Sequence, residues 1–108
     1  MRELSVPPTA TVGPDDALTD MVARNAADRP GAVGFRVQRD GRWTDVTYAE
    51  FAAQVAGVAK GLVAAGIEPG DRVALMARTR YEWTVVDYAV WTAGAVVVPV
   101  YELSLIHI

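Results

Sequence analysis

The sequence reads Trp91-Thr92-Ala93-Gly94-Ala95-Val96-Val97-Val98-Pro99-Val100-Tyr101 near its C-terminal end, and this stretch decides the fold. Gly94 is placed to end a helix in the left-handed conformation, and residues 95–100 form a run rich in β-branched valine. An earlier apolar run, residues 72–77, is bounded by turn and cap signals and predicts a buried strand. Strand, helix and strand within about 30 residues make a βαβ unit, which predicts parallel pairing with a right-handed crossover.

The helix between these two runs is expected to begin at a capping box, Thr79-x-x-Glu82, and to end at Gly94. Its apolar residues cover most of the circumference, which predicts burial on more than one side. Its aromatic residues have helical spacing, and we interpret them as core rather than as a stacking platform: Tyr81, Trp83, Tyr88 and Trp91. Asp87 lies among them, and a buried carboxylate is costly. We therefore expect exposure or a local partner for Asp87 rather than a catalytic role.

A second helix is predicted to begin within Val46-Thr47-Tyr48-Ala49-Glu50-Phe51. In this capping box the Thr47 hydroxyl should accept from the Glu50 N–H, and the Glu50 carboxylate from the Thr47 N–H. Gly57 and Gly61 leave a flat strip on the helix for close approach, and Gly66 is the predicted C-cap. The apolar positions follow helical spacing: Phe51, Val55, Val58, Ala59, Leu62 and Val63.

Upstream of this helix the pattern changes to period two, with apolar residues at 33, 35 and 37. Asp40-Gly41 is a dipeptide typical of tight hairpin turns, so residues 42–46 should form the return strand. Asp15-Asp16 are expected to cap an earlier helix that ends at residues 28–31. One face of this helix carries Leu18, Met21, Val22 and Asn25. Residues 1–14, with three prolines, predict an extended N-terminal arm.

Composition restricts the function classes. The chain has 108 residues, 52% of them hydrophobic, and a net charge of −3 without a block of like charges, so nucleic acid is not an expected partner. It has no cysteine, which excludes disulfides and thiolate chemistry. The N-terminus lacks the pattern of a signal peptide, and the longest uncharged stretch, residues 88–101, is too short to span a bilayer. We expect a soluble, cytoplasmic protein.

Several segments together resemble the opening of the adenylate-forming (AMP-dependent synthetase/ligase) enzymes. Residues 47–51 resemble the Thr/Ser-Tyr-x-Glu-Leu element of that family, and residues 93–100 its Ala-Gly-x-x-x-x-Pro element. Residues 66–74 match its G-(I/V)-x-x-G-D-R-V-A linker, and Arg29-Pro30 and the strand at 32–35 fall in the same order. The resemblance covers residues 15–102. It implies an α/β fold in which a hairpin, a βαβ unit and helices packed on the sheet form an incomplete, layered N-terminal domain of the acyl-CoA synthetase fold.

Within the family, residues 78–83 and 97–102 are similar to bacterial long-chain fatty acyl-CoA ligases. Two departures weaken this subfamily assignment: Tyr81 stands where that group has proline, and the Thr-Ser-Ser continuation after Glu102 is absent. The resemblance implies a parent enzyme that activates a fatty acid as acyl-adenylate and transfers it to coenzyme A, using ATP and Mg²⁺. Two alternatives stay open: another adenylate-forming enzyme (an amino-acid adenylation domain, or an aryl or short-chain acid ligase), and a stand-alone α/β interaction module.

The phosphate loop, metal-binding glutamate, ribose-binding aspartate and catalytic lysine that the resemblance implies have no counterpart in these residues. We therefore assign no catalytic, cofactor-binding or metal residue here, and we expect the segment alone to be inactive. Lys60, the single lysine, is interpreted as a solvated helix residue, and His107, the single histidine, as neither ligand nor base. Residues 103–108 depart from the pattern and are interpreted as sequence foreign to the protein, with a strand extension as the alternative. Two strands and a hairpin leave an open sheet edge, which predicts that the remainder of the same domain is a partner.

Overall fold

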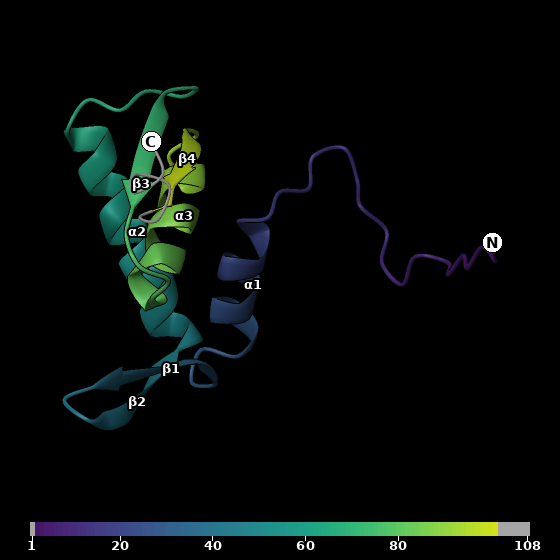
Figure 1. Cartoon of the computed structure of the whole chain (residues 1–108), viewed down its shortest axis with the longest axis horizontal. Helices are drawn as coiled ribbons and strands as arrows, with labels where there is room; N and C mark the ends of the chain where they lie inside the picture. The colour runs from purple at the N-terminus through teal and green to yellow at the C-terminus, as the bar shows by residue number, and fades with distance from the viewer. Residues whose placement is uncertain (1, 102–108) are drawn as a thin grey trace.

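The computed structural model describes residues 2–101 (Figure 1). Its helices and strands, in chain order, are α1 (Asp20–Asp28), β1 (Val33–Arg39), β2 (Arg42–Thr47), α2 (Tyr48–Ala64), β3 (Arg72–Met76), α3 (Tyr81–Thr92) and β4 (Val96–Val100). Residues 2–19 contain no helix or strand and run away from the helices in Figure 1. The α/β fold, with a hairpin and a βαβ unit, is confirmed. The predicted atypical tail at 103–108, including His107, lies outside the described residues, as does Glu102.

Strands β3 and β4 pair in parallel, from Arg72 opposite Val96 to Met76 opposite Val100, and α3 connects them. The prediction that these strands are buried is wrong, because α3 covers only one face of the pair. Exposed apolar side chains on the other face are Met76 at 56%, Val96 at 50% and Val98 at 38%. The expected single sheet is also not formed: β1–β2 and β3–β4 are separate two-stranded sheets.

Both predicted glycine C-caps are confirmed. At the end of α2, Gly66 has φ 101° and its N–H donates to Val63 O, while the N–H of Ile67 donates to Leu62 O. The end of α3 repeats this arrangement, with Gly94 at φ 79°. A side chain at either glycine would be strained, because L-residues rarely adopt this backbone conformation. The two glycines therefore fix where each helix ends.

Of the two predicted N-terminal capping boxes, one is confirmed in part and the other is wrong. At α2, the Glu50 N–H donates to Thr47 Oγ1 at 3.2 Å as expected, but the Glu50 carboxylate accepts from the Thr47 hydroxyl at 3.3 Å rather than from the backbone. The capping box expected at Thr79 is wrong. Arg80 occupies the N-cap position of α3 without a side-chain cap hydrogen bond. Its guanidinium donates a hydrogen bond to the Glu82 carboxylate at 2.7 Å.

The predicted hairpin is confirmed, and its turn residues Asp40 and Gly41 have φ values of 52° and 74°. Helix α1, by contrast, begins at Asp20 rather than just after Asp15-Asp16. The Asp16 carboxylate accepts from the Gly13 N–H at 2.6 Å, and this local hydrogen bond closes a turn before the helix. The predicted apolar face of α1 is only partly used: Val22 packs on the core, whereas Leu18 is 64% exposed.

The core lies where α2 meets the hairpin and α3. Phe51 is its central residue, with ring-centroid distances of 4.8 Å to Phe35, 6.3 Å to Tyr81 and 5.7 Å to Tyr88. The prediction of aromatic core residues in α3 therefore holds for Tyr81 and Tyr88, while Trp91 is 37% exposed. Within residues 2–101 the buried apolar residues are Val46, Phe51, Val55, Ala59, Val85, Ala89, Val90 and Ala95. Around the predicted flat strip, a Cβ built at Gly57 or Gly61 would meet no atom of the described residues within 4 Å, apart from its chain neighbours and the backbone of its own helix.

Candidate functional site

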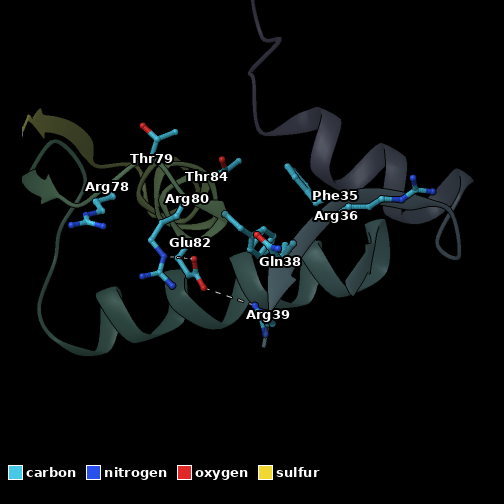
Figure 2. Close-up of a pocket in the computed structure, with 11 residues that line it drawn as sticks. Phe35, Arg36, Gln38, Arg39, Arg78, Thr79, Arg80, Glu82 and Thr84 are labelled. Carbon is cyan, nitrogen blue, oxygen red and sulfur yellow. Dashed lines mark hydrogen bonds and ion pairs between the residues drawn. The ribbon is translucent and has the colours of Figure 1, made fainter. Parts of the chain in front are cut away.

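A groove of about 590 Å³ lies between strand β1 and the start of α3. Figure 2 shows its lining, which joins residues about forty positions apart in the sequence. From β1 come Phe35, Arg36, Val37, Gln38 and Arg39. From the segment before α3 and the first turn of this helix come Arg78, Thr79, Arg80, Tyr81, Glu82 and Thr84. This second group includes the residues whose sequence resembles the long-chain ligases.

Ion pairs hold Arg39, Arg80 and Glu82 in this groove. Glu82 Oε2 lies 2.7 Å from Arg80 Nε, and Glu82 Oε1 lies 3.9 Å from Arg39 Nη2, so one carboxylate joins the hairpin to α3. The hydrogen bond from Arg80 is the main reason that the pKa of Glu82 lies below its usual value, and the same bond raises the pKa of Arg80. Arg36 turns away toward Asp45 on β2, at 3.3 Å. The arginines therefore do not converge on one point (Figure 2).

Tyr81 forms the apolar floor of the groove. Its hydroxyl donates to Gln54 Oε1 on α2, and its ring makes a T-shaped contact with Phe35 at a centroid distance of 5.2 Å. Burial raises the pKa of the Tyr81 hydroxyl, against the opposing charge of Arg39. A neutral, hydrogen-bonded phenol that is packed on two aromatic rings is a structural group. Tyr81 thus fixes α3 to α2 and to the hairpin.

Lys60 and Asp87, for which the sequence predicted no catalytic role, lie apart from each other and from the groove. Lys60 is exposed on α2 and does not line the groove. Asp87 is half-buried on α3, also outside the groove, and burial raises the pKa of its carboxyl against a hydrogen bond with Trp83. Trp83 is thus the local partner expected for this carboxylate. Within residues 2–101, no three or more His, Cys, Asp or Glu side chains are grouped so that they could hold a metal ion.

Two segments that carry the family resemblance meet in space. The N–H of Ala49 donates to Pro30 O at 3.1 Å, and the Arg29 guanidinium lies over the Tyr48 ring, 5.2 Å from its centroid. Gly34 lies against the same ring, where a Cβ would approach Tyr48 carbons at 3.0 Å. Neither these contacts between the α1–β1 connection and the start of α2 (the clasp) nor the Arg39–Glu82 bridge was predicted from the sequence. The order of the motifs was visible in the sequence, but nothing local in it indicated that they touch.

The sequence pattern of a family described as "AMP-binding enzyme" matches residues 22–105, more than half of the chain. The chain belongs to this family. It is 47% identical over 104 residues to the long-chain-fatty-acid–CoA ligase FadD15 of Mycobacterium tuberculosis, covering 96% of this chain and 17% of that protein. Thus the chain spans about a sixth of the length of this curated relative.

Solved structures agree with the fold. The fatty acyl-adenylate ligase of Legionella pneumophila, in complex with acyl adenylate and pyrophosphate, matches with a TM-score of 0.71 and 26% identity, over 78% of this chain and 15% of that one. The N-terminal subdomain of Klebsiella oxytoca NpsA matches with a TM-score of 0.67 and 29% identity, over 79% of this chain and 21% of that one. Among residues 2–101, no helix is both long and apolar enough to cross a membrane.

Proposed function

We propose that this segment is part of an ATP-dependent acyl-CoA ligase that acts on long-chain fatty acids. The observation that carries the proposal is the 47% identity to FadD15 over 104 residues. This length includes both the contacts between Arg29-Pro30 and the start of α2 and the groove between β1 and α3. The implied reaction joins the fatty acid carboxylate to the α-phosphate of ATP, with loss of pyrophosphate. The thiol of coenzyme A then displaces AMP from the acyl-adenylate.

The described residues do not fit the groups that this reaction needs. ATP, Mg²⁺ and coenzyme A require positioned cations, metal-binding carboxylates and phosphate-binding backbone. In residues 2–101 no acidic cluster suited to a metal is present, and Arg39, Arg80 and Glu82 of the groove are held in ion pairs with one another. We therefore assign no chemical step to these residues.

The role that the geometry supports is scaffolding. Residues 15–102 would form the first part of the large N-terminal domain, and its remainder would cover the bare face of β3–β4. The contact of Phe51 with Phe35 and the ion pair of Glu82 with Arg39 keep the hairpin and α3 in one arrangement on α2. A cytoplasmic location and the absence of a nucleic-acid partner belong to the same proposal.

The proposal is tested on the intact protein that contains this segment. Exchange of labelled pyrophosphate into ATP is measured with palmitate, a short-chain acid, an aryl acid and a set of amino acids. We expect exchange with palmitate, and palmitoyl-CoA once coenzyme A is added. Exchange with an amino acid alone would refute the proposal and indicate an amino-acid adenylation enzyme, and no exchange with any acid would exclude the whole class.

The scaffolding role has its own test. The 108-residue chain is titrated with ATP–Mg²⁺ by isothermal calorimetry, and we expect no heat of binding. Micromolar affinity would show that these residues do contain a nucleotide site, in conflict with the arrangement described above.

A further inference from the structure

A second, smaller groove of about 290 Å³ lies on the other side of α3, against β4. Trp83, Asp87 and Trp91 follow one another at intervals of four, so they share one face of the helix. The opposite face, with Val85 and Ala89, is buried in the core that α3 forms with α2. The second wall of the groove comes from β4 and the residue after it: Val97, Pro99 and Tyr101. We name this groove the Trp83–Trp91 groove.

Its aromatic wall is held in place by the core. The Trp91 ring makes a T-shaped contact with Tyr88 at a centroid distance of 5.2 Å, and Tyr88 makes another with Phe51 at 5.7 Å. Trp91 is nevertheless 37% exposed, and Tyr101 across the groove is 68% exposed. A rigid, accessible indole face next to a carboxylate is a favourable place for a cation, because the ring face and the carboxylate both carry negative potential.

The carboxylate in this groove has no cationic partner among the described residues. Ion pairs within residues 2–101 involve Asp45 and Glu82, and none of them involves Asp87. The hydrogen-bond partner of Asp87 is Trp83, and burial of the carboxyl raises its pKa. A partly desolvated carboxylate is stabilised by a hydrogen-bonded cation, and it costs free energy without one.

We propose that the Trp83–Trp91 groove binds the guanidinium of an arginine side chain. A planar guanidinium can stack on an indole ring while its N–H groups donate to a carboxylate, whereas an ammonium is a compact, strongly hydrated charge that cannot stack. The groove offers these two elements at neighbouring turns of one helix.

The arginine comes from another segment of the same polypeptide. FadD15, of which this chain matches 17%, contains more than four-fifths of its length outside the matched part. Strand β4, which forms one wall of the groove, has exposed apolar side chains on its other face, and further segments of such an enzyme would cover them. This assignment of the occupant rests on the proposed function, because it requires the rest of such an enzyme.

Binding is measured with N-acetyl-L-arginine methylamide as the probe and tryptophan fluorescence of the 108-residue chain as the signal. The Trp43→Phe substitution removes the distant tryptophan, which is 70% exposed on the hairpin. We expect saturable quenching in the millimolar range. The neutral isostere N-acetyl-L-citrulline methylamide should bind about ten-fold more weakly, because a charge-assisted hydrogen bond is lost.

Two substitutions locate the site. Asp87→Asn should weaken arginine binding to the level of the citrulline probe, while Asp45→Asn, on the far hairpin, should leave it unchanged. If Asp87→Asn alters the circular dichroism spectrum, Trp91→Leu replaces it and should reduce both affinity and quenching. Equal binding of the two probes, equal binding of a lysine analogue, or no saturable quenching would each overturn the proposal. None of these outcomes affects the pyrophosphate exchange of the intact enzyme, so the two proposals fail independently.

Discussion

Replacing Phe51 by alanine should remove most of the stability of the folded chain. Phe51 is 5% exposed and joins the hairpin to α3 through its contacts with Phe35, Tyr81 and Tyr88. Truncation of a buried phenylalanine to alanine costs about 3–5 kcal/mol, and aromatic pairs add about 0.5–1.5 kcal/mol each. Domains of this size are stable by about 5–15 kcal/mol. The chain belongs near the low end, since only eight apolar residues are buried within residues 2–101, three of them alanine.

The assay is urea denaturation of the 108-residue chain, followed by far-UV circular dichroism. Phe51→Ala should abolish the cooperative transition or move its midpoint close to zero urea, and Phe51→Leu should give an intermediate midpoint. Trp43→Ala is the matched control, because this aromatic residue is 70% exposed and its loss should change the free energy of unfolding by less than about 0.5 kcal/mol. Equal midpoints for Phe51→Ala and Trp43→Ala would refute the claim that these rings form the core.

Three further changes test local features by the same denaturation assay. Thr47→Ala removes the acceptor for the Glu50 N–H at the start of α2 and should lower the free energy of unfolding by about 1 kcal/mol. Gly34→Ala places a Cβ about 3.0 Å from the Tyr48 ring and should cost about 1–3 kcal/mol through overpacking of the clasp. Glu82→Gln should lower the unfolding midpoint at pH 7, and the difference from wild type should vanish as the pH falls below 4.5, the usual pKa of a glutamate.

The pH dependence follows from the direction of the shift. The folded state holds the pKa of Glu82 below the unfolded value, so this group contributes stability above the unfolded pKa and loses it as the pH falls through the folded one. A difference between Glu82→Gln and wild type that grows toward low pH would contradict the Arg80–Glu82 pair.

Each of the other two changes has a control of the same residue type at another position. Gly57→Ala, on the open face of α2, would place its Cβ more than 4 Å from every described atom beyond its chain neighbours and its own helix backbone, and should stabilise the helix by about 1 kcal/mol. If Gly34→Ala behaves like Gly57→Ala, the close packing of Tyr48 is wrong. Thr44→Ala on β2 should have a smaller effect than Thr47→Ala, because Thr44 caps no helix.

Features set by a few neighbouring residues could be predicted from the sequence. The Asp40-Gly41 turn and the glycine caps at 66 and 94 depend on local backbone conformation, and all three are present. The predicted capping box at the start of α3 was wrong because Arg80 competes for the Glu82 carboxylate that the box would use. That competition depends on the geometry of the charged side chains, and the spacing of residues does not determine it.

Burial could be predicted less well than element type. The apolar runs at 72–77 and 95–100 indicated strands covered on both faces, yet residues 2–101 cover only one face of the pair. Likewise, no pattern in the sequence indicated that Arg39 and Glu82 would bridge two elements, since more than forty residues separate them. Contacts across such distances depend on tertiary packing.

The separation of the hairpin from the parallel pair has a practical consequence. Among the described residues, rings and one carboxylate link β1 to α3, and no shared strand ladder does so. Lengthening the loop at residues 40–41 would therefore leave both ladders in register. A peptide tag or a fluorescent reporter inserted at that tip would extend into solvent, and the site gives an internal labelling position that spares both ends of the polypeptide.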